Sequence, residues 1–221
     1  MSVSELWYQS SGTLGATPVL LLHGLTGDAT TWQEVAPLLA ERAWLHAVDL
    51  RGHGASPWPG EYSFELMRDD VVALLDRLEL DRVVLVGHSL GGVVSYLIAQ
   101  AYPDRVAGLV LEEPPPPRPL ARTVGPRPQT SLSYDWDVRA AIIGQVVAPD
   151  PRWWPALAAI AAPALVVGGA HSHLPQDWLA EMAALMPRGR YLALDAEHAV
   201  HAALPAEFAA AVHTFLDEHG L

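Results

Sequence analysis

The segment GHSLGG, residues 87–92, has the residue types and spacing of a serine that acts as a nucleophile. Such a serine is held on a sharp turn between a strand and a helix, where the backbone is strained and small residues are needed two positions before and after it. Gly87 and Gly91 meet that requirement around Ser89. The apolar run Val83–Val86 precedes the segment and a helical pattern follows it, as the turn requires. We therefore predict that Ser89 is the nucleophile of an acyl-transfer reaction.

A second segment, His23-Gly24-Leu25, follows another apolar run and could supply the hydrogen-bond donors that acyl transfer needs. Backbone N–H groups stabilise the negative charge that develops on the carbonyl oxygen, and one of them belongs to the residue after the nucleophile. We predict that the amides of Leu25 and Leu90 form this oxyanion hole. His23, Gly24 and His88 are expected to border the substrate pocket, although a plain tight turn would also account for residues 23–24.

Short apolar strands alternate with amphipathic helices along most of the chain. The predicted strands are rich in Val and Leu and cover Val19–Leu22, Leu45–Leu50, Val83–Val86, Val106–Leu111, Leu165–Val167 and Tyr191–Leu194. Between them, apolar residues recur at helical spacing over 67–78, 93–101 and 205–215. This alternation predicts an α/β fold, with a mostly parallel central sheet and helices on both of its faces.

Residues 114–162 interrupt this alternation because they are rich in proline. Proline lacks the N–H that a central strand donates, so no core strand is expected in this segment. A disordered linker would also be proline-rich, but three tryptophans are unusual in a segment that buries nothing. Trp136, Trp153 and Trp154 therefore predict a small folded cap, in which they either line an apolar substrate pocket or bury the cap on the core.

The length and composition agree with one folded unit. The chain has 221 residues, of which 51% are hydrophobic and 17% charged, so it can bury a substantial core. We predict a single domain over 1–221, with its core in 1–113 and 163–221, a cap insertion over 114–162, and short cap helices near 135–147 and 155–161. The pattern does not indicate an oligomeric state.

The charge balance argues against a nucleic-acid partner. The formal net charge is −12, the isoelectric point is near 5.1 and only 13 residues are Lys or Arg, whereas phosphate binding needs clustered basic side chains. No apolar run reaches the roughly 18 residues of a membrane helix, and Met1–Gly12 lacks the order of a signal peptide. The chain has no cysteine, which excludes disulfides and thiolate nucleophiles. We expect a soluble cytoplasmic protein that acts on a small molecule, without membrane or nucleic-acid partners.

Four motifs together resemble the α/β-hydrolase superfamily, from Val19 to about Leu216. Residues 22–25, LHGL, resemble the family's oxyanion loop, and residues 49–56, DLRGHGAS, resemble the turn after its next strand. Residues 87–92 resemble its nucleophile elbow. Residues 195–198, DAEH, and the helical pattern downstream resemble the segment that carries its catalytic histidine. The resemblance implies the α/β fold predicted above.

The resemblance selects His198 as the general base among the ten histidines of the chain. An imidazole suits this role because its unperturbed pKa lies near neutrality. His201 could share a helix face with His198, but no H-E-x-x-H pattern or third ligand accompanies the two, so we expect no metal site. His201, His213 and His219 are expected to be structural or surface residues.

In this family a catalytic triad joins the serine and the histidine to an acid that orients the histidine. The position of that acid departs here from the commonest pattern of the family. That pattern has an aspartate after the strand that corresponds to Leu165–Gly168, where this chain has His171. A histidine cannot supply the negative charge that orients the base. Some members of the superfamily use a carboxylate at the end of the preceding core strand instead, and the resemblance then points to Glu113.

Alternatives to this acid stay open at the level of sequence. Adjacent strand residues point to opposite sides, so Glu112 and Glu113 cannot both face the histidine. If both glutamates were solvated at the entrance of the cap, Asp137 or Asp177 would have to supply the carboxylate.

Motifs and resemblance together imply a serine hydrolase that needs no cofactor and cleaves a small carboxylic ester, lactone or thioester through an acyl-enzyme. A carbon–carbon bond hydrolase, or a lyase or synthase, could use the same triad. A non-catalytic ligand-sensing protein is the alternative from another class, because His171 stands where the usual aspartate is missing.

Overall fold

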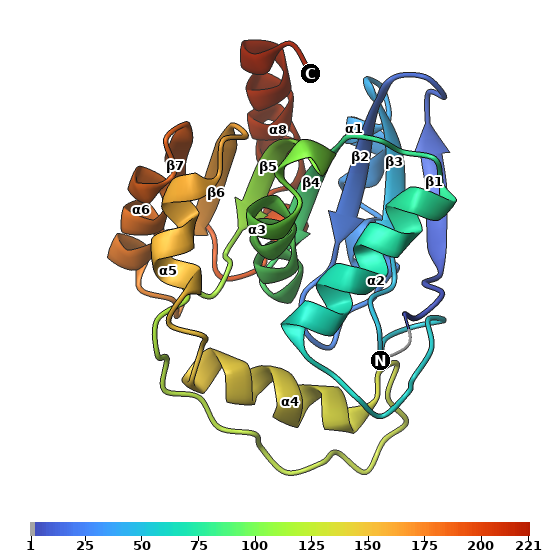
Figure 1. The fold of residues 1–221 in the computed structure, drawn as a ribbon, viewed down its shortest axis with the longest axis vertical. Helices are drawn as coiled ribbons and strands as arrows, with labels where there is room; N and C mark the ends of the chain where they lie inside the picture. The colour runs from blue at the N-terminus through green and yellow to red at the C-terminus, as the bar shows by residue number, and fades with distance from the viewer. Residues whose placement is uncertain (1–2) are drawn as a thin grey trace.

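The computed structural model describes residues 3–221, which form one seven-stranded sheet with its helices (Figure 1). The strands are β1 (Tyr8–Gly12), β2 (Thr17–Leu22), β3 (Ala43–Val48), β4 (Val83–His88), β5 (Val106–Glu112), β6 (Ala164–Gly169) and β7 (Gly189–Leu194). Their order across the sheet is β1-β3-β2-β4-β5-β6-β7, with β1 antiparallel to β3 and the other neighbouring pairs parallel. The predicted mostly parallel sheet is confirmed.

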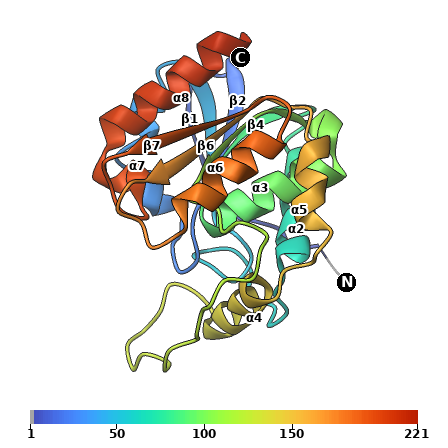
Figure 2. The ribbon, with the colours of Figure 1, turned by 90° about the vertical axis from the view of Figure 1, so that its left-hand side faces the viewer.

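Helices cover both faces of this sheet. One face carries α2 (Phe64–Arg77), α3 (Leu90–Ala101), α5 (Trp153–Ala156) and α6 (Gln176–Leu185), and the other carries α1 (Ala36–Leu39) and α8 (Pro205–His219) (Figures 1 and 2). Alternate strand residues supply the two cores: Leu20 and Leu22 of β2 belong to the first, whereas Val19 and Leu21 belong to the second. Among residues 3–221, no helix has both the length and the apolar character needed to cross a membrane.

The sequence predicted six of these strands but not β1. Its residues, YQSSG, are mostly exposed, and it lies at the edge of the sheet with β3 as its partner. It therefore lacks the apolar alternation on which the prediction relied.

β3 ends at Val48 because Asp49 begins a turn, and the Asp49 carboxylate accepts hydrogen bonds from the amides of Ala29 and Ala55 at 2.7 and 2.8 Å.

Residues 114–152 leave the sheet as a long loop and α4 (Trp136–Val147), and both lie beyond the carboxyl edge of the strands in the two views (Figures 1 and 2). Gln145 of α4 docks this segment on the start of α2. Its Oε1 accepts a hydrogen bond from the amide of Phe64 at 2.8 Å, and its Nε2 donates to Glu65 at 2.8 Å. The cap is thereby held over the end of β4, where the elbow lies.

The last part of the predicted cap packs on the core instead. Trp153 is 8% exposed and its ring lies against that of Phe64, with centroids 5.9 Å apart. Gln100 of α3 donates to the carbonyl of Trp153, and Leu157 and Ile160 are buried in the same core. We propose from this packing that the cap insertion ends near residue 152 rather than at 162.

Candidate active site

The strand–turn–helix segment around Ser89 has the strained geometry that its sequence predicts. Ser89 lies between β4 and α3 with φ 50° and ψ −109°, and its amide donates to the carbonyl of Glu112 at 2.8 Å. A side chain at Gly87 would overlap the backbone of Gly91, and one at Gly91 would overlap the carbonyl of Leu22. The two glycines therefore allow the tight turn that exposes the Ser89 hydroxyl.

A buried carboxylate holds the predicted general base. Nδ1 of His198 lies 3.0 Å from Oε2 of Glu113, and the Glu113 side chain is completely buried while that of His198 is 27% exposed. Glu113 comes directly after β5 and has φ 49°. The alternative acids Asp137 and Asp177 are exposed, on α4 and α6. The burial of Glu113 excludes the reading in which it is solvated at the cap entrance.

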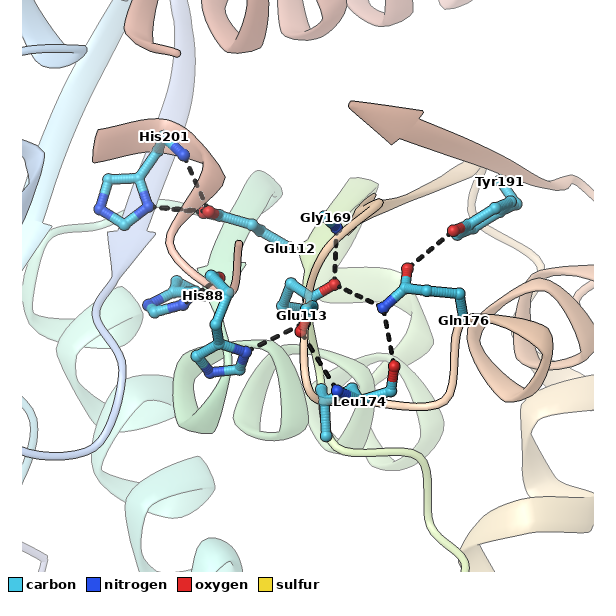
Figure 3. Close-up of polar contacts among 10 residues, drawn as sticks. His88, Glu112, Glu113, Gly169, Leu174, Gln176, Tyr191 and His201 are labelled. Carbon is cyan, nitrogen blue, oxygen red and sulfur yellow. Dashed lines mark hydrogen bonds and ion pairs between the residues drawn. The ribbon is translucent and has the colours of Figure 1, made fainter. Parts of the chain in front are cut away.

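Four donors surround the Glu113 carboxylate. Oε1 accepts from the amide of Gly169 at 2.7 Å and from Nε2 of Gln176 at 3.0 Å, while Oε2 accepts from the hydroxyl of Ser172 in addition to His198. Figure 3 shows Gly169 and Gln176 directed at Glu113 from one side. A buried carboxylate stays charged only when hydrogen bonds replace its water, and this set provides them.

A hydrogen bond from Tyr191 orients the side-chain amide of Gln176. The hydroxyl of Tyr191 on β7 donates to its Oε1 at 2.8 Å, so its Nε2 faces Glu113 (Figure 3). Gly168 and Gly169 end β6, and a side chain at Gly168 would overlap Gln176 while one at Gly169 would overlap the carbonyl of Glu197. These glycines let the backbone approach the carboxylate closely, a role that the sequence reasoning did not identify.

Glu112 belongs to a different pair. It is buried on the other side of β5, where its carboxylate accepts from the amide of His201 at 2.9 Å and lies 2.7 Å from Nδ1 of that residue (Figure 3). Burial raises the pKa of Glu112, but the neighbouring His88 and His201 outweigh it and the pKa is lowered. The two adjacent glutamates thus face opposite sides, and His201 is a buried structural residue that packs against Trp32.

His88 connects the elbow to the segment of the general base. Burial lowers its pKa to about 4, so the ring is neutral at pH 7. Its Nε2 donates to the carbonyl of His198 at 3.0 Å. A Cβ at Gly24 would lie only 2.6 Å from Nδ1 of His88, so this glycine leaves room for the ring. The ring of His88 therefore packs inside the protein, between the oxyanion loop and residue 198.

His23 shapes the predicted oxyanion loop. Its Nδ1–H donates to the carbonyl of Gly24 at 2.8 Å, and its Nε2 accepts from the amide of Leu50 at 3.0 Å. Burial lowers the pKa of His23 to about 3, which keeps the ring neutral as these two bonds require. Among the described residues, neither the amide of Leu25 nor that of Leu90 donates to a protein acceptor. Leu90 begins α3, where helical N–H groups have no partner within the helix.

One cavity joins the predicted catalytic residues. It has a volume of about 290 Å³, and Ser89 and His198 line it together with Leu25 and Leu90. The cap contributes apolar walls from α4, formed by Ile142, Ile143 and Val146, and three basic side chains, Arg122, Arg139 and His173, also line it. The sequence reasoning missed these cap residues, because it could not predict how residues 114–147 fold back over the elbow.

Within the described residues, none of the six that were predicted to line the pocket is among those that line this cavity. His23 is completely buried, His88 packs between the oxyanion loop and residue 198, and a Cβ at Gly24 would lie 3.4 Å from that of Ser89. Trp153 packs on the core, Trp154 lies under the guanidinium of Arg118 at 3.7 Å, and Trp136 packs against Tyr134 with ring centroids 6.4 Å apart. The tryptophans therefore anchor the cap and its end, and shorter aliphatic side chains of α4 form the cavity wall.

Comparisons with known proteins agree with this architecture. Residues 17–158 match the family model described as alpha/beta hydrolase fold. A segment of 112 residues is 40% identical to the lipase LipV of Mycobacterium tuberculosis strain H37Rv, and it spans 51% of this chain and 42% of that protein. The chain thus matches less than half the length of that curated relative.

Solved structures resemble the whole chain. A thermophilic esterase from Thermogutta terrifontis is 28% identical with a TM-score of 0.85, over 98% of this chain and 94% of that one. The enol-lactonase from Burkholderia xenovorans LB400 shares the fold, at 24% identity and a TM-score of 0.83 over 97% of each chain. Because the family model matches more than half of the sequence, the chain belongs to the α/β-hydrolase fold family.

Proposed function

We propose that this protein is a serine hydrolase that cleaves small carboxylic esters, with Ser89 as nucleophile, His198 as general base and Glu113 as the acid that orients it. The observation that carries the proposal is that Ser89, on a strained turn, and His198, bonded to a buried carboxylate, line one cavity. The relatives named a lipase and an esterase support ester hydrolysis over other reactions of the fold.

The proposed reaction begins when Oγ of Ser89 attacks the ester carbonyl carbon and His198 takes the hydroxyl proton. The carbonyl electrons move to the oxygen, which the amides of Leu25 and Leu90 hold as an oxyanion. Collapse of this intermediate expels the alcohol, to which His198 returns the proton. Water then attacks the acyl-enzyme by the same route, releasing the carboxylic acid and restoring the Ser89 hydroxyl.

Glu113 would act through His198 rather than on the substrate. Its negative charge stabilises the imidazolium that forms when His198 takes the proton, and its bond to Nδ1 leaves Nε2 free to face Ser89. The four donors around it hold the carboxylate in place, so the imidazole meets the nucleophile in one orientation.

The cavity favours small substrates. A volume of about 290 Å³ lies at the lower limit of pockets that hold drug-sized ligands, and more than half of the residues that line it are apolar. We therefore expect short acyl chains to be cleaved faster than long ones. A partner other than a small molecule is not needed for this reaction.

The test combines covalent labelling with turnover and product analysis. A fluorophosphonate probe is expected to label wild type at Ser89, found by peptide mass spectrometry, and not Ser89→Ala. 4-Nitrophenyl butyrate is expected to yield butyrate and 4-nitrophenol, with turnover abolished in Ser89→Ala and in His198→Ala. Absence of both labelling and turnover in folded wild-type protein would overturn the proposal in favour of a ligand-binding protein, and products other than acid and alcohol would favour a lyase.

A further inference from the structure

Two arginines of the cap line the cavity without a carboxylate partner. Arg122 lies in the long cap loop and Arg139 in α4, and both border the same cavity as Ser89 and His198. In the described part of the chain, neither guanidinium forms an ion pair or donates a hydrogen bond to a protein acceptor. The Nε of Arg139 is itself buried and unpaired, and an unpaired buried donor calls for a partner that the protein does not provide.

Arg139 lies over the ring of Trp136, with its Cζ 5.5 Å from the ring centroid, whereas two other cap arginines pair with a carboxylate. Arg118 pairs with Glu181 at 2.7 Å and stacks on Trp154, and Arg152 pairs with Asp150 at 2.5 Å. The formal net charge of the chain is −12, so acidic partners are abundant. The cavity nevertheless has no Asp or Glu among the residues that line it. The basic side chains that line this cavity are therefore a local feature, which the net charge of the chain does not explain.

The positive charge of Arg122 lies close to the reaction centre. Burial lowers the pKa of His173, His198 and Arg122 lower it further, and the Glu113 carboxylate opposes them only in part. The ring of His173 is 4.6 Å from that of His198 between centroids. Catalytic groups, aliphatic side chains of α4 and guanidinium groups from two separate cap elements thus line one cavity.

We propose that Arg122 and Arg139 bind a carboxylate carried by the substrate, so that the preferred substrate is a small ester with a free carboxylate separated by a short alkyl segment from the bond that is cleaved. This proposal rests on the ester hydrolysis proposed above. The planar guanidinium group matches a carboxylate through two parallel N–H donors. Arg122 is exposed, whereas the Nε of Arg139 is buried, and a pairing shielded from water is stronger than one on the surface. The aliphatic wall suits the alkyl segment, and the absence of acids removes the repulsion that would otherwise exclude an anion.

The test uses pairs of esters that differ only in charge. The first pair is the 4-nitrophenyl half-ester of adipic acid and the same ester of adipic acid monoamide, which places the charge in the acyl part. The second pair is the acetate esters of 4-hydroxybenzoate and 4-hydroxybenzamide, which places it in the leaving group. In at least one pair, wild type is expected to favour the carboxylate by about tenfold or more in kcat/KM, mostly through KM.

Variants of the two arginines then test whether their side chains cause this preference for the carboxylate. In Arg122→Gln/Arg139→Gln the ratio is expected to fall to within about twofold of one, and in Arg122→Lys/Arg139→Lys part of it is expected to survive. Arg127→Gln removes a positive charge from the same loop at an exposed position outside the cavity lining, and it is expected to keep the wild-type ratio. Ratios at or below one in both wild-type pairs, or a ratio that the double Gln variant leaves unchanged, would overturn the proposal.

Binding separates this proposal from the proposed function. Isothermal titration calorimetry measures binding of the same two pairs to Ser89→Ala. In at least one pair, the ester with the free carboxylate is expected to bind about tenfold more tightly than the matching ester with a carboxamide. If wild type cleaves none of these esters but this preference is present, ester hydrolysis fails and the carboxylate subsite stands. Wild type could instead cleave the ester bond of the uncharged, carboxamide-bearing members while Ser89→Ala binds both members of each pair equally. Ester hydrolysis would then stand and the proposed carboxylate subsite would be wrong.

Discussion

Nδ1 of His198 lies 3.0 Å from Oε2 of Glu113, although the two residues are 85 positions apart and the glutamate side chain is completely buried. The contact places the acid after β5 rather than after β6, where the common pattern of the family has it. The amide of Gly169, at the end of β6, donates to the same carboxylate at 2.7 Å. The strand that carries the acid in the commonest pattern of the family thus contributes a hydrogen bond to the proposed acid here.

Replacement of this carboxylate tests its role. Glu113→Gln removes the negative charge and turns an NH2 group toward a set of hydrogen-bond donors, so the imidazole loses both its orientation and its counter-charge. We expect kcat for 4-nitrophenyl butyrate to fall by about 10³–10⁴-fold, the scale seen when a triad acid is replaced by its amide. Steady-state kinetics measure the loss, and circular dichroism checks that the variant is folded.

The matched control is Asp177→Asn, at the exposed start of α6. Its carboxylate makes no contact with His198, and we expect kcat to stay within about twofold of wild type. If Glu113→Gln kept wild-type turnover while Asp177→Asn lost it, the assignment of the acid would be reversed.

The sequence was sufficient where function depends on local geometry. The small residues around Ser89 are needed because the turn leaves no space for a Cβ, and this requirement is visible in GxSxG itself. The strands of the parallel sheet were also predictable, because their residues are buried on both faces and form short apolar runs. β1 was missed because an exposed edge strand has no such run.

Features that depend on long-range packing could not be predicted. Arg122 and Arg139 reach the cavity through the path of the cap, and that path depends on contacts such as Gln145 with α2 rather than on a local pattern. The tryptophans were ambiguous for the same reason, since a large aromatic ring serves equally well in a cavity wall or in an anchor. Three of the donors around Glu113 come from the end of β6, the loop after it and the start of α6, and the glycines that end β6 have no signature of their own.

The buried pair of Glu112 and His201 gives a prediction about stability. Glu112→Leu leaves the ring of His201 without its carboxylate partner in the core, and the loss of one member of a buried pair costs about 3–5 kcal/mol. We expect a loss of this size in the free energy of unfolding. In Glu112→Leu/His201→Phe both polar groups are gone, and most of the stability is expected to return. Urea unfolding of wild type, the single variant and the double variant measures these free energies of unfolding.

An exposed pair serves as the control. Nε2 of His171 lies 2.7 Å from Asp195, and both side chains are largely exposed. Asp195→Asn is expected to leave the unfolding midpoint unchanged within error. A smaller loss for Glu112→Leu than for Asp195→Asn, or a double variant as unstable as the single, would contradict the prediction.

The buried neutral histidines predict that stability falls in mild acid. Burial lowers the pKa of His23 to about 3 and the pKa of His53 and His88 to about 4, whereas an unfolded histidine titrates near 6.5. Below pH 6.5 the unfolded chain therefore binds protons that the folded chain does not. Each such histidine lowers the free energy of unfolding by up to about 1.4 kcal/mol per pH unit between 6.5 and its folded pKa.

Urea unfolding at pH 7.5, 6.5, 5.5 and 4.5 measures this slope. We expect a small loss of stability from pH 7.5 to 6.5, where the unfolded histidines begin to bind protons, and a steeper loss below it. The lowered pKa of Glu112 adds a further loss only below about pH 4.5, since a carboxylate with a depressed pKa stabilises the fold above its unfolded pKa. Constant stability from pH 6.5 to 4.5 would show that these rings are protonated in the folded protein.

Gly24 tests whether His88 positions the general base. A Cβ on residue 24 would lie 2.6 Å from Nδ1 and 2.9 Å from Cε1 of His88, whose ring holds the carbonyl of His198. We expect Gly24→Ala to displace the ring and with it His198, lowering kcat at least tenfold with little change in KM, because small displacements of catalytic groups have large effects on rate. Gly144→Ala, in α4 with no atom near the added methyl group, is expected to leave kcat unchanged.

A double-mutant cycle distinguishes the ring from the loop. His88→Ser removes the ring that the new methyl group would meet, so Gly24→Ala is expected to lower kcat much less in the His88→Ser background than in wild type. The difference between the two losses measures the coupling between residues 24 and 88. Equal losses in both backgrounds would place the effect of Gly24→Ala in the oxyanion loop alone, and His88 would then have no part in holding His198 at the nucleophile.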